Sequence, residues 1–190
     1  MPLSLPIDAD ANELLSASPL ALLIGMLLDQ QVTIEKAFSS PAELSRRLGA
    51  PLDAAAIAAM ALDDLSALFR ERPALHRYPG SMAKRVQDVC RVVATDYGNK
   101  VENIWEGVTD GEELVGRLNA LPGFGIQKSK IFAALLGKQL GVSPDGWEQA
   151  TKPYGDAAAF LSVADITSPE TLEKVRANKR AMKAKAHAKG

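Results

Sequence analysis

Residues 118–136 read LNALPGFGIQKSKIFAALL and form the most informative segment of the chain. An amphipathic segment runs into Leu-Pro-Gly-Phe-Gly at 121–125, and a second helix-forming segment follows at once. Glycines two residues apart permit a tight turn and let backbone N–H groups approach a partner without interference from a Cβ atom. The start of the second helix adds unpaired N–H groups and a partial positive charge. The stretch therefore predicts two helices joined by a hairpin that binds a backbone phosphate.

The predicted phosphate contacts come from the hairpin itself, with two lysines adding charge at its rim. These residues are Leu121, Pro122, Gly123, Phe124 and Gly125, followed by Lys128 and Lys130. An ordinary joint between two helices uses the same letters, and that alternative stays open. The complete Leu-Pro-Gly-x-Gly pattern, with apolar residues on both helices, favours the DNA-binding hairpin. Such a hairpin contacts the sugar–phosphate chain and positions DNA without reading its sequence.

The rest of the chain also predicts helices. Hydrophobic residues make up 47% and aromatic residues only 5%, while Ala and Leu are frequent and favour helix. Serine precedes proline at Ser18, Ser40 and Ser168, which predicts three capped helix starts. No alternating strand pattern is present, so the expected fold is all-α. Further predicted helices cover 53–60, 62–70, 81–97, 101–106 and 110–120, and 141–165 is predicted as loop or short turns before the last helix.

Several classes of protein are disfavoured by composition. Cys90 is the single cysteine, which excludes an intramolecular disulfide and a four-cysteine iron–sulfur cluster. His76 and His187 stand alone, so we expect no metal and no cofactor. The apolar run at 20–28 is too short to cross a bilayer, and no basic cluster precedes it. We expect no membrane partner and a cytoplasmic, nucleoid-associated protein.

Charge is distributed unevenly along the chain. Residues 171–190 carry seven Lys or Arg against one Glu, which leaves 15 of the 22 basic and 22 of the 23 acidic residues in the rest. A basic tail on an acidic body fits an arm that follows phosphates. A solvated helix end, where lysine is favoured by the helix dipole, explains the same charges. Both interpretations stay open.

At the hairpin the chain resembles the helix-hairpin-helix glycosylase superfamily, which includes endonuclease III and the alkylated-base and adenine glycosylases. The resemblance implies two helical lobes with a cleft between them, and an essential aspartate after the hairpin. Gln127 stands where bifunctional members carry a Schiff-base lysine, and an ungapped count of eighteen residues from it reaches Asp145. The segment 141–145, GVSPD, has the Gly/Pro and Asp character of the family. Asp145 is therefore the predicted catalytic residue.

Two more stretches are similar to the family. The segment 22–33, LLIGMLLDQQVT, resembles its early apolar helix and polar turn, and Gln31 falls where a side chain enters the duplex. Gln30 offers a second amide, although both glutamines also suit the end of an apolar helix. The segment 78–86, YPGSMAKRV, precedes the hairpin lobe and offers Lys84 to phosphate. The resemblance covers about 19–145 and implies the branch without an iron–sulfur cluster. The residues after Asp145, GWEQ, depart from the Thr-His continuation of the best-studied members.

Each candidate side chain has a chemical and a structural interpretation. A carboxylate at Asp145 would stabilise the oxocarbenium-like transition state and orient water, but Pro-Asp-Gly is also a common surface turn. Trp147, Tyr154 and Tyr78 suit stacking on an extruded base, or equally a role in the core. Asp29 and Glu35 lie near the polar turn, yet no spacing requires them. Gln127 lacks an amine, and the side chain of its neighbour Lys128 is rotated by about 100°, so no Schiff-base lyase step is expected.

Together these residues predict a single domain over 1–190, with a helical bundle over about 19–120, the hairpin and its loop over 110–145, and a loop and basic helix over 146–190. The leading hypothesis is a monofunctional DNA glycosylase of base excision repair. It would act as a monomer on double-stranded DNA with a damaged or mispaired base. A non-catalytic DNA-binding protein is the alternative, and a helical protein with an acidic partner is the third. The enzyme hypothesis requires Asp145, Gln31 and the hairpin to face one groove.

Overall fold

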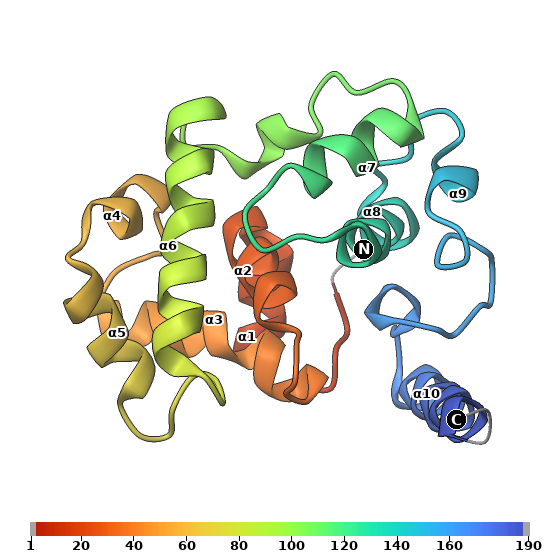
Figure 1. The fold of residues 1–190 in the computed structure, drawn as a ribbon, viewed down its shortest axis with the longest axis horizontal. Coiled ribbons are helices and arrows are strands. Elements are labelled where there is room, and N and C mark those ends of the chain that lie inside the picture. The colour runs from red at the N-terminus through yellow and green to blue at the C-terminus, as the bar shows by residue number, and fades with distance from the viewer. Residues whose placement is uncertain (1–2, 188–190) are drawn as a thin grey trace.

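The computed structural model describes residues 3–187, and this part of the chain is all-helical, as predicted (Figure 1). Its α-helices are α1 (Ala9–Ala17), α2 (Pro19–Leu28), α3 (Ile34–Leu48), α4 (Ala54–Ala59), α5 (Leu62–Arg70), α6 (Pro79–Asp96), α7 (Gly111–Asn119), α8 (Ile126–Leu140), α9 (Trp147–Ala150) and α10 (Pro169–His187). Two short 3-10 helices are η1 (Val101–Ile104) and η2 (Val163–Asp165).

Helix starts follow the predicted capping residues at two of the three Ser-Pro pairs. The Ser18 side chain accepts a hydrogen bond from the Ala21 amide, and Pro19 is the first residue of α2. The Ser168 hydroxyl accepts one from the Thr171 amide at 3.2 Å, at the start of α10. Each cap satisfies an N–H group that the first turn leaves without a partner.

The start predicted at Ser40 is wrong. Helix α3 begins at Ile34, where the Thr33 side chain caps it, and Pro41 lies inside the helix. The buried Ser40 hydroxyl instead lies 2.7 Å from the carbonyl oxygens of both Lys36 and Leu75. A serine inside a helix commonly bonds back to the carbonyl four residues earlier. Pro41 offers no N–H group to the Ala37 carbonyl four residues before it, so α3 has one helical hydrogen bond fewer at this point.

Helix α2 is the centre of the fold. Its residues from Leu20 to Leu28 are all buried, and it lies in the middle of the molecule in Figure 1. Gly25 allows α3 to come close, because a Cβ atom there would lie 2.8 Å from the Phe38 ring. Helices α4 and α5 pack on α6 to one side, and α7 and α8 pair on the other, with α9 against both. The end of α2 is thus held firmly next to the α7–α8 hairpin.

Two remaining features bear on the site. The segment 141–165 is mostly turns, as predicted, but it contains α9 and η2. Among residues 3–187 no single helix is long and apolar enough to cross a membrane. Helices α1 and α2 reach that length only as a pair, and the chain bends by 113° between them.

Candidate functional site

The α7–α8 hairpin has the conformation that its sequence predicts. Leu121 and Phe124 point into the core with 3% and 4% of their surfaces exposed, so they hold the turn in place. Gly123 has φ +83°, and a Cβ atom there would lie 2.5 Å from the Leu27 side chain. Gly125 precedes α8 with open space around its Cα, so the first N–H groups of α8 face solvent beside it. The hairpin therefore presents backbone, while its apolar side chains are structural.

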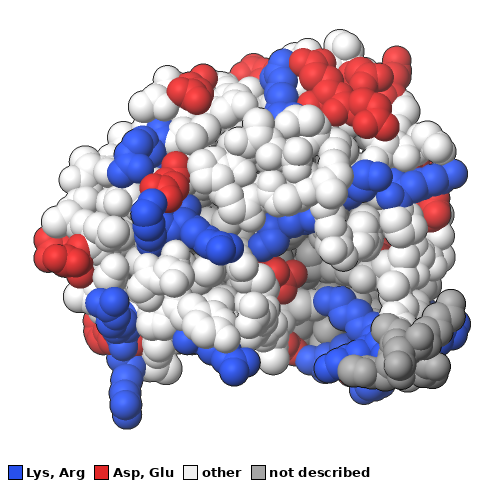
Figure 2. All heavy atoms as spheres, in the orientation of Figure 1, with Lys and Arg blue, Asp and Glu red and all other residues white. Residues whose placement is uncertain are grey.

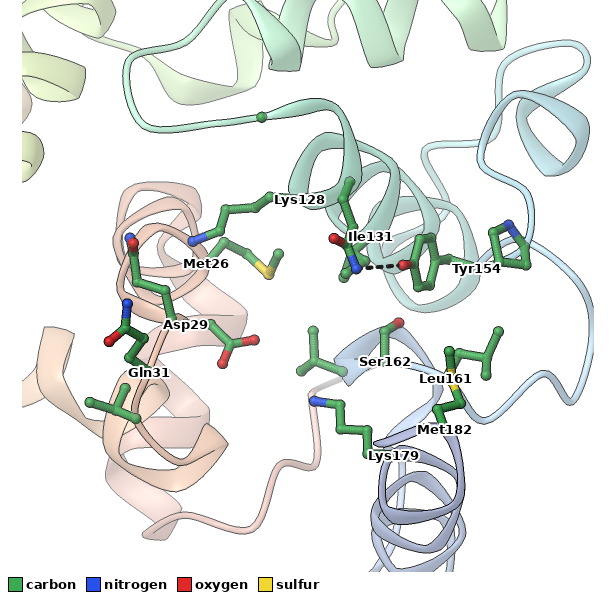
Figure 3. A pocket seen from close by; sticks show the side chains of 16 residues that line it. Met26, Asp29, Gln31, Lys128, Ile131, Tyr154, Leu161, Ser162, Lys179 and Met182 are labelled. Carbon is green, nitrogen blue, oxygen red and sulfur yellow. Dashed lines mark hydrogen bonds between the residues drawn. The ribbon is translucent and has the colours of Figure 1, made fainter. Parts of the chain in front are cut away.

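A cavity of about 640 Å³ opens at this N-terminal end of α8. Its walls are the turn after α2, the first turns of α8, the segment 153–163 and helix α10 (Figure 3). Gly125 of the hairpin and Gln31 of the turn after α2 both line it. Gln31 is exposed and has φ +55°, a strained conformation for a residue with a side chain. The turn after α2 thus holds one amide side chain at the cavity mouth.

Three charged side chains line this cavity. Asp29 ends α2, and burial raises the pKa of its carboxyl, while the positive charges of Lys179 and then Lys128 oppose that shift. Burial lowers the pKa of Lys128 to about 8, against the opposing charge of Asp29. The Lys128 ammonium donates to the Leu27 carbonyl oxygen at 2.8 Å and lies 5.9 Å from the centre of the Phe124 ring. In Figure 3 the Asp29 carboxylate faces the cavity, with Lys179 across from it.

A comparison with known families shows to which family the chain belongs. The sequence matches the HhH-GPD superfamily base excision DNA repair protein family over residues 24–189. The chain belongs to that superfamily. A search of curated proteins found no match. The predicted superfamily and its helical fold are confirmed, and with them a role on DNA in base excision repair.

Some HhH-GPD proteins carry a four-cysteine iron–sulfur cluster, and the residues of this chain do not fit one. Cys90 is its single cysteine and is fully buried on α6. Burial raises the pKa of the Cys90 thiol to about 12, which disfavours the thiolate that a metal requires.

Several predicted site residues meet at the HhH-GPD cavity. Gln30, Gln31, Gly125, Lys128 and Tyr154 all line it. The amide of Gln127, the residue predicted to stand at the Schiff-base position, donates to the Tyr154 hydroxyl at 2.9 Å and holds that ring in the wall (Figure 3). The Gln30 amide nitrogen donates to the Leu27 carbonyl oxygen, and its side-chain oxygen accepts from Arg85. Gln30 therefore has the structural role that was the alternative for it, whereas Gln31 stays at the mouth.

Other predicted contacts lie outside the cavity. Lys84 is exposed on α6 and pairs with Asp88. Lys130 lies 3.4 Å from the Lys152 carbonyl oxygen at the outside of α8. Tyr78 is 43% exposed, beside Arg77 at the start of α6, and does not line the cavity. The stacking role predicted for Tyr78 has no support in this position.

Asp145 does not share the groove with Gln31 and the hairpin, so this geometrical expectation is wrong. It is exposed and lines a separate depression with Trp147. Its backbone pairs with α7: the Asp145 amide donates to the Thr109 carbonyl at 2.9 Å, and its carbonyl accepts from the Gly111 amide at 2.8 Å. These bonds hold Asp145 near the far end of α8. Trp147 packs against Gly137 there, which removes it from the base pocket as well.

The ungapped count fails because the chain takes a detour after α8. It passes through α9, reaches the cavity at Pro153 and Tyr154, and lines it again at Leu161, Ser162 and Val163. Ser162 caps η2 there, and its side chain accepts a hydrogen bond from the Ala164 amide. The Asp165 carboxylate in turn accepts one from the Ser162 amide. The segment that returns to the cavity after α9 thus contributes a serine side chain and no carboxylate to its lining. Among the described residues, Asp29 supplies the carboxylate in the cavity lining. The sequence places it near the polar turn but offers no spacing that requires it.

Proposed function

We propose that this HhH-GPD protein is a monofunctional DNA glycosylase that draws a damaged or mispaired base into the cavity at the start of α8. One observation carries the proposal: a single cavity brings together Gly125 of the hairpin, the exposed Gln31 and the half-buried Asp29. Family membership supports action on DNA in base excision repair. The absence of lyase activity and the action on double-stranded DNA as a monomer are parts of the proposal.

The first step is DNA binding with extrusion of one nucleotide. The exposed N–H groups before and in the first turn of α8 suit a backbone phosphate, because the helix dipole adds positive potential there. Moving a base out of the stack costs roughly a few kcal/mol of unstacking and unpairing energy. Gln31 fills the space that the base leaves. Tyr154, held by Gln127 at 2.9 Å, offers its ring as a wall for the extruded base.

The second step is hydrolysis of the N-glycosidic bond, with Asp29 as the carboxylate. The bond from C1′ to the base nitrogen breaks, and its electron pair leaves with the base. A water oxygen bonds to C1′, and its proton passes to the Asp29 carboxylate. A fixed negative charge beside the sugar stabilises the positive charge that develops on it. Lys179 and Lys128 support this role, because their charges lower the pKa of Asp29 against the effect of burial.

The expectation of no lyase step follows from where the amines lie. Gln127 occupies the family position for a Schiff-base lysine and is engaged with Tyr154. The Lys128 ammonium is directed at α2, where the Leu27 carbonyl accepts its hydrogen bond. Neither residue presents an amine at the centre of the cavity. Lys179 also lines the cavity, but it stands on α10 and not at the position of the family's Schiff-base lysine. The proposed product is therefore an intact strand with an abasic site.

A non-catalytic DNA-binding protein is the second candidate, and the surface position of Asp145 favours it. The two candidates differ in whether any base is released. Base release also allows a test of the two aspartates by substitution, because Asp29 lies in the cavity and Asp145 lies outside it.

The test is a panel of duplexes, each with one lesion or mispair, incubated with the protein and then cleaved by alkali. We expect the wild type to excise at least one base. Asp29→Asn should slow that excision about a hundredfold or more, as loss of a catalytic acid–base group does. Asp145→Asn is the matched control and should keep the wild-type rate. The opposite result would return catalysis to Asp145. Duplex binding without excision of any base would establish the second candidate.

A further inference from the structure

Helix α10 forms one wall of the cavity and is anchored at its beginning. Leu172 and Val175 are buried on that face, and the helix packs against η2. Arg176 pairs with Glu35, the second residue of α3, and so ties α10 to the turn that carries Gln31. One turn later Lys179 and Met182 line the cavity itself. The position of α10 beside the cavity mouth is therefore fixed by packing and by an ion pair.

The charges of α10 are balanced in its first half and unbalanced in its second. Glu170 pairs with Lys174, and Glu173 pairs with Arg176. After Glu173 no acidic residue follows up to Lys185, and within the described chain no ion pair includes Arg180 or Lys183. Both of these side chains are exposed. The second half of α10 thus carries positive charge that the protein itself does not neutralise.

Arg176, Arg180 and Lys183 fall on one face of the helix. Their spacing of four and then three residues places them in a row, because such positions are neighbours on a helix surface. The row begins at the contact with Glu35 on α3 and runs beside Lys179 at the cavity rim. We name Arg180 and Lys183 the α10 stripe. A helix dipole favours lysine in the last turn, and Lys185 on the other face of α10 fits that explanation. Arg180 and Lys183 instead lie next to Lys179 and Met182, which line the cavity.

The hairpin and α10 stand on different walls of the same cavity, as Figure 3 shows for Lys128 and Lys179. In Figure 2, basic side chains surround this hollow, whereas acidic side chains gather at the upper edge of the view, over α7. A nucleotide drawn into the cavity remains joined to a phosphate on each side. The hairpin can bind one of these two phosphates, and the other phosphate must then lie near a different wall of the cavity.

We infer that the α10 stripe binds the DNA backbone on the side of the extruded nucleotide opposite to the hairpin. This inference rests on the proposed function, since it takes DNA with one base in the cavity as the ligand. Arg180 and Lys183 contribute charge to phosphate oxygens, while Lys179 at the cavity rim lies across from Asp29. The basic end of the chain thereby acts as a second grip on one strand, and the acidic body of the protein stays away from the duplex.

Salt dependence of duplex binding tests the stripe. Each phosphate contact contributes about 0.9 to the slope of log affinity against log salt concentration. Arg180→Gln with Lys183→Gln should therefore reduce the steepness of that slope by about 1.8, two contacts' worth. The matched control replaces two exposed cations that do not line the cavity, Arg91→Gln with Lys100→Gln, and should keep the wild-type slope. Thermal unfolding of both double variants confirms that each is folded.

The outcomes separate this inference from the proposed function. If the stripe variant keeps the wild-type slope while Gly125→Ala loses affinity for duplex, the stripe is not a DNA contact and the proposed function stands. If the variant keeps duplex binding but loses binding to polyglutamate, the stripe serves an acidic protein and the inference is overturned. If the wild type binds no duplex at all, both proposals fail.

Discussion

The two ends of helix α8 differ in what surrounds them. At its start, Gly125 has open space around it, and Gln127 and Lys128 face a cavity. Near its end, a Cβ atom on Gly137 would lie 2.5 Å from the Trp147 ring. Glycine leaves room for a ligand at the first end and for a packed side chain at the second. Glycine therefore marks a binding surface or a packing contact according to what fills the space beside it.

The largest effects are expected at the open end. Gly123→Ala forces a side chain into φ +83° and against Leu27, so we expect it to lower the free energy of unfolding by about 1–3 kcal/mol, as overpacking does, and to abolish duplex binding. Gly125→Ala meets no neighbour within 4 Å and should remain folded. Its Cβ atom occupies the space that a phosphate would use, so its duplex affinity should fall. Thermal unfolding and duplex titration measure the two effects separately. Wild-type affinity in Gly125→Ala would show that the hairpin is an ordinary helical joint.

At the packed end we expect the reverse result. Gly137→Ala places a methyl group against the Trp147 indole and should cost about 1–3 kcal/mol of stability, since the core there must shift. Excision and duplex affinity, measured well below the melting temperature, should stay at wild-type values because neither residue lines the cavity. Loss of excision in a folded Gly137→Ala protein would bring the Asp145 region back into the chemistry.

Local sequence rules were sufficient to predict one part of the site. The hairpin at 121–125 and the caps at Ser18 and Ser168 depend on residues within a few positions of one another, and the structure has them as predicted. Gln31 and Tyr154 also reach the cavity. Ser40 shows the limit of a local rule. Thr33 caps the helix at an earlier position, and the Ser40 hydroxyl donates to the distant carbonyl oxygen of Leu75.

The carboxylate could not be predicted in the same way. Counting from Gln127 to Asp145 assumes that the chain runs directly from α8 to the cavity, whereas α9 and the turns after it lengthen that path. Asp29 stands more than a hundred positions before Lys179, and only folding brings their charges together. In the sequence, Asp29 stands out only as the polar residue that follows an entirely apolar helix. Such a position is by itself an ordinary helix cap.

A smaller effect is expected on the pH dependence of excision. Burial raises the pKa of Asp29, and protonation removes the charge that the transition state needs. Activity should therefore fall as the pH falls through this raised pKa, at a higher pH than an ordinary aspartate would give. Lys179 opposes the shift, so Lys179→Gln should move this acid limb to still higher pH. Lys130→Gln removes a lysine that does not line the cavity, and its pH profile should match the wild type. If excision by all three proteins fell over the same pH range, Asp29 would have no role in the rate-limiting step.

The smallest expected signal is the one from Lys128. Its pKa of about 8 means that much of the amine is uncharged above pH 8, which is the form that attacks an aldehyde. Yet its nitrogen is held 2.8 Å from the Leu27 carbonyl, on the α2 side of the cavity. We therefore expect no borohydride-trapped adduct with abasic-site duplex at pH 7 or at pH 9. An adduct that grows with pH and disappears in Lys128→Gln would show that the amine leaves Leu27 to reach C1′. In that case the open end of α8 would carry a lyase step without a lysine at position 127, and the proposed enzyme would be bifunctional.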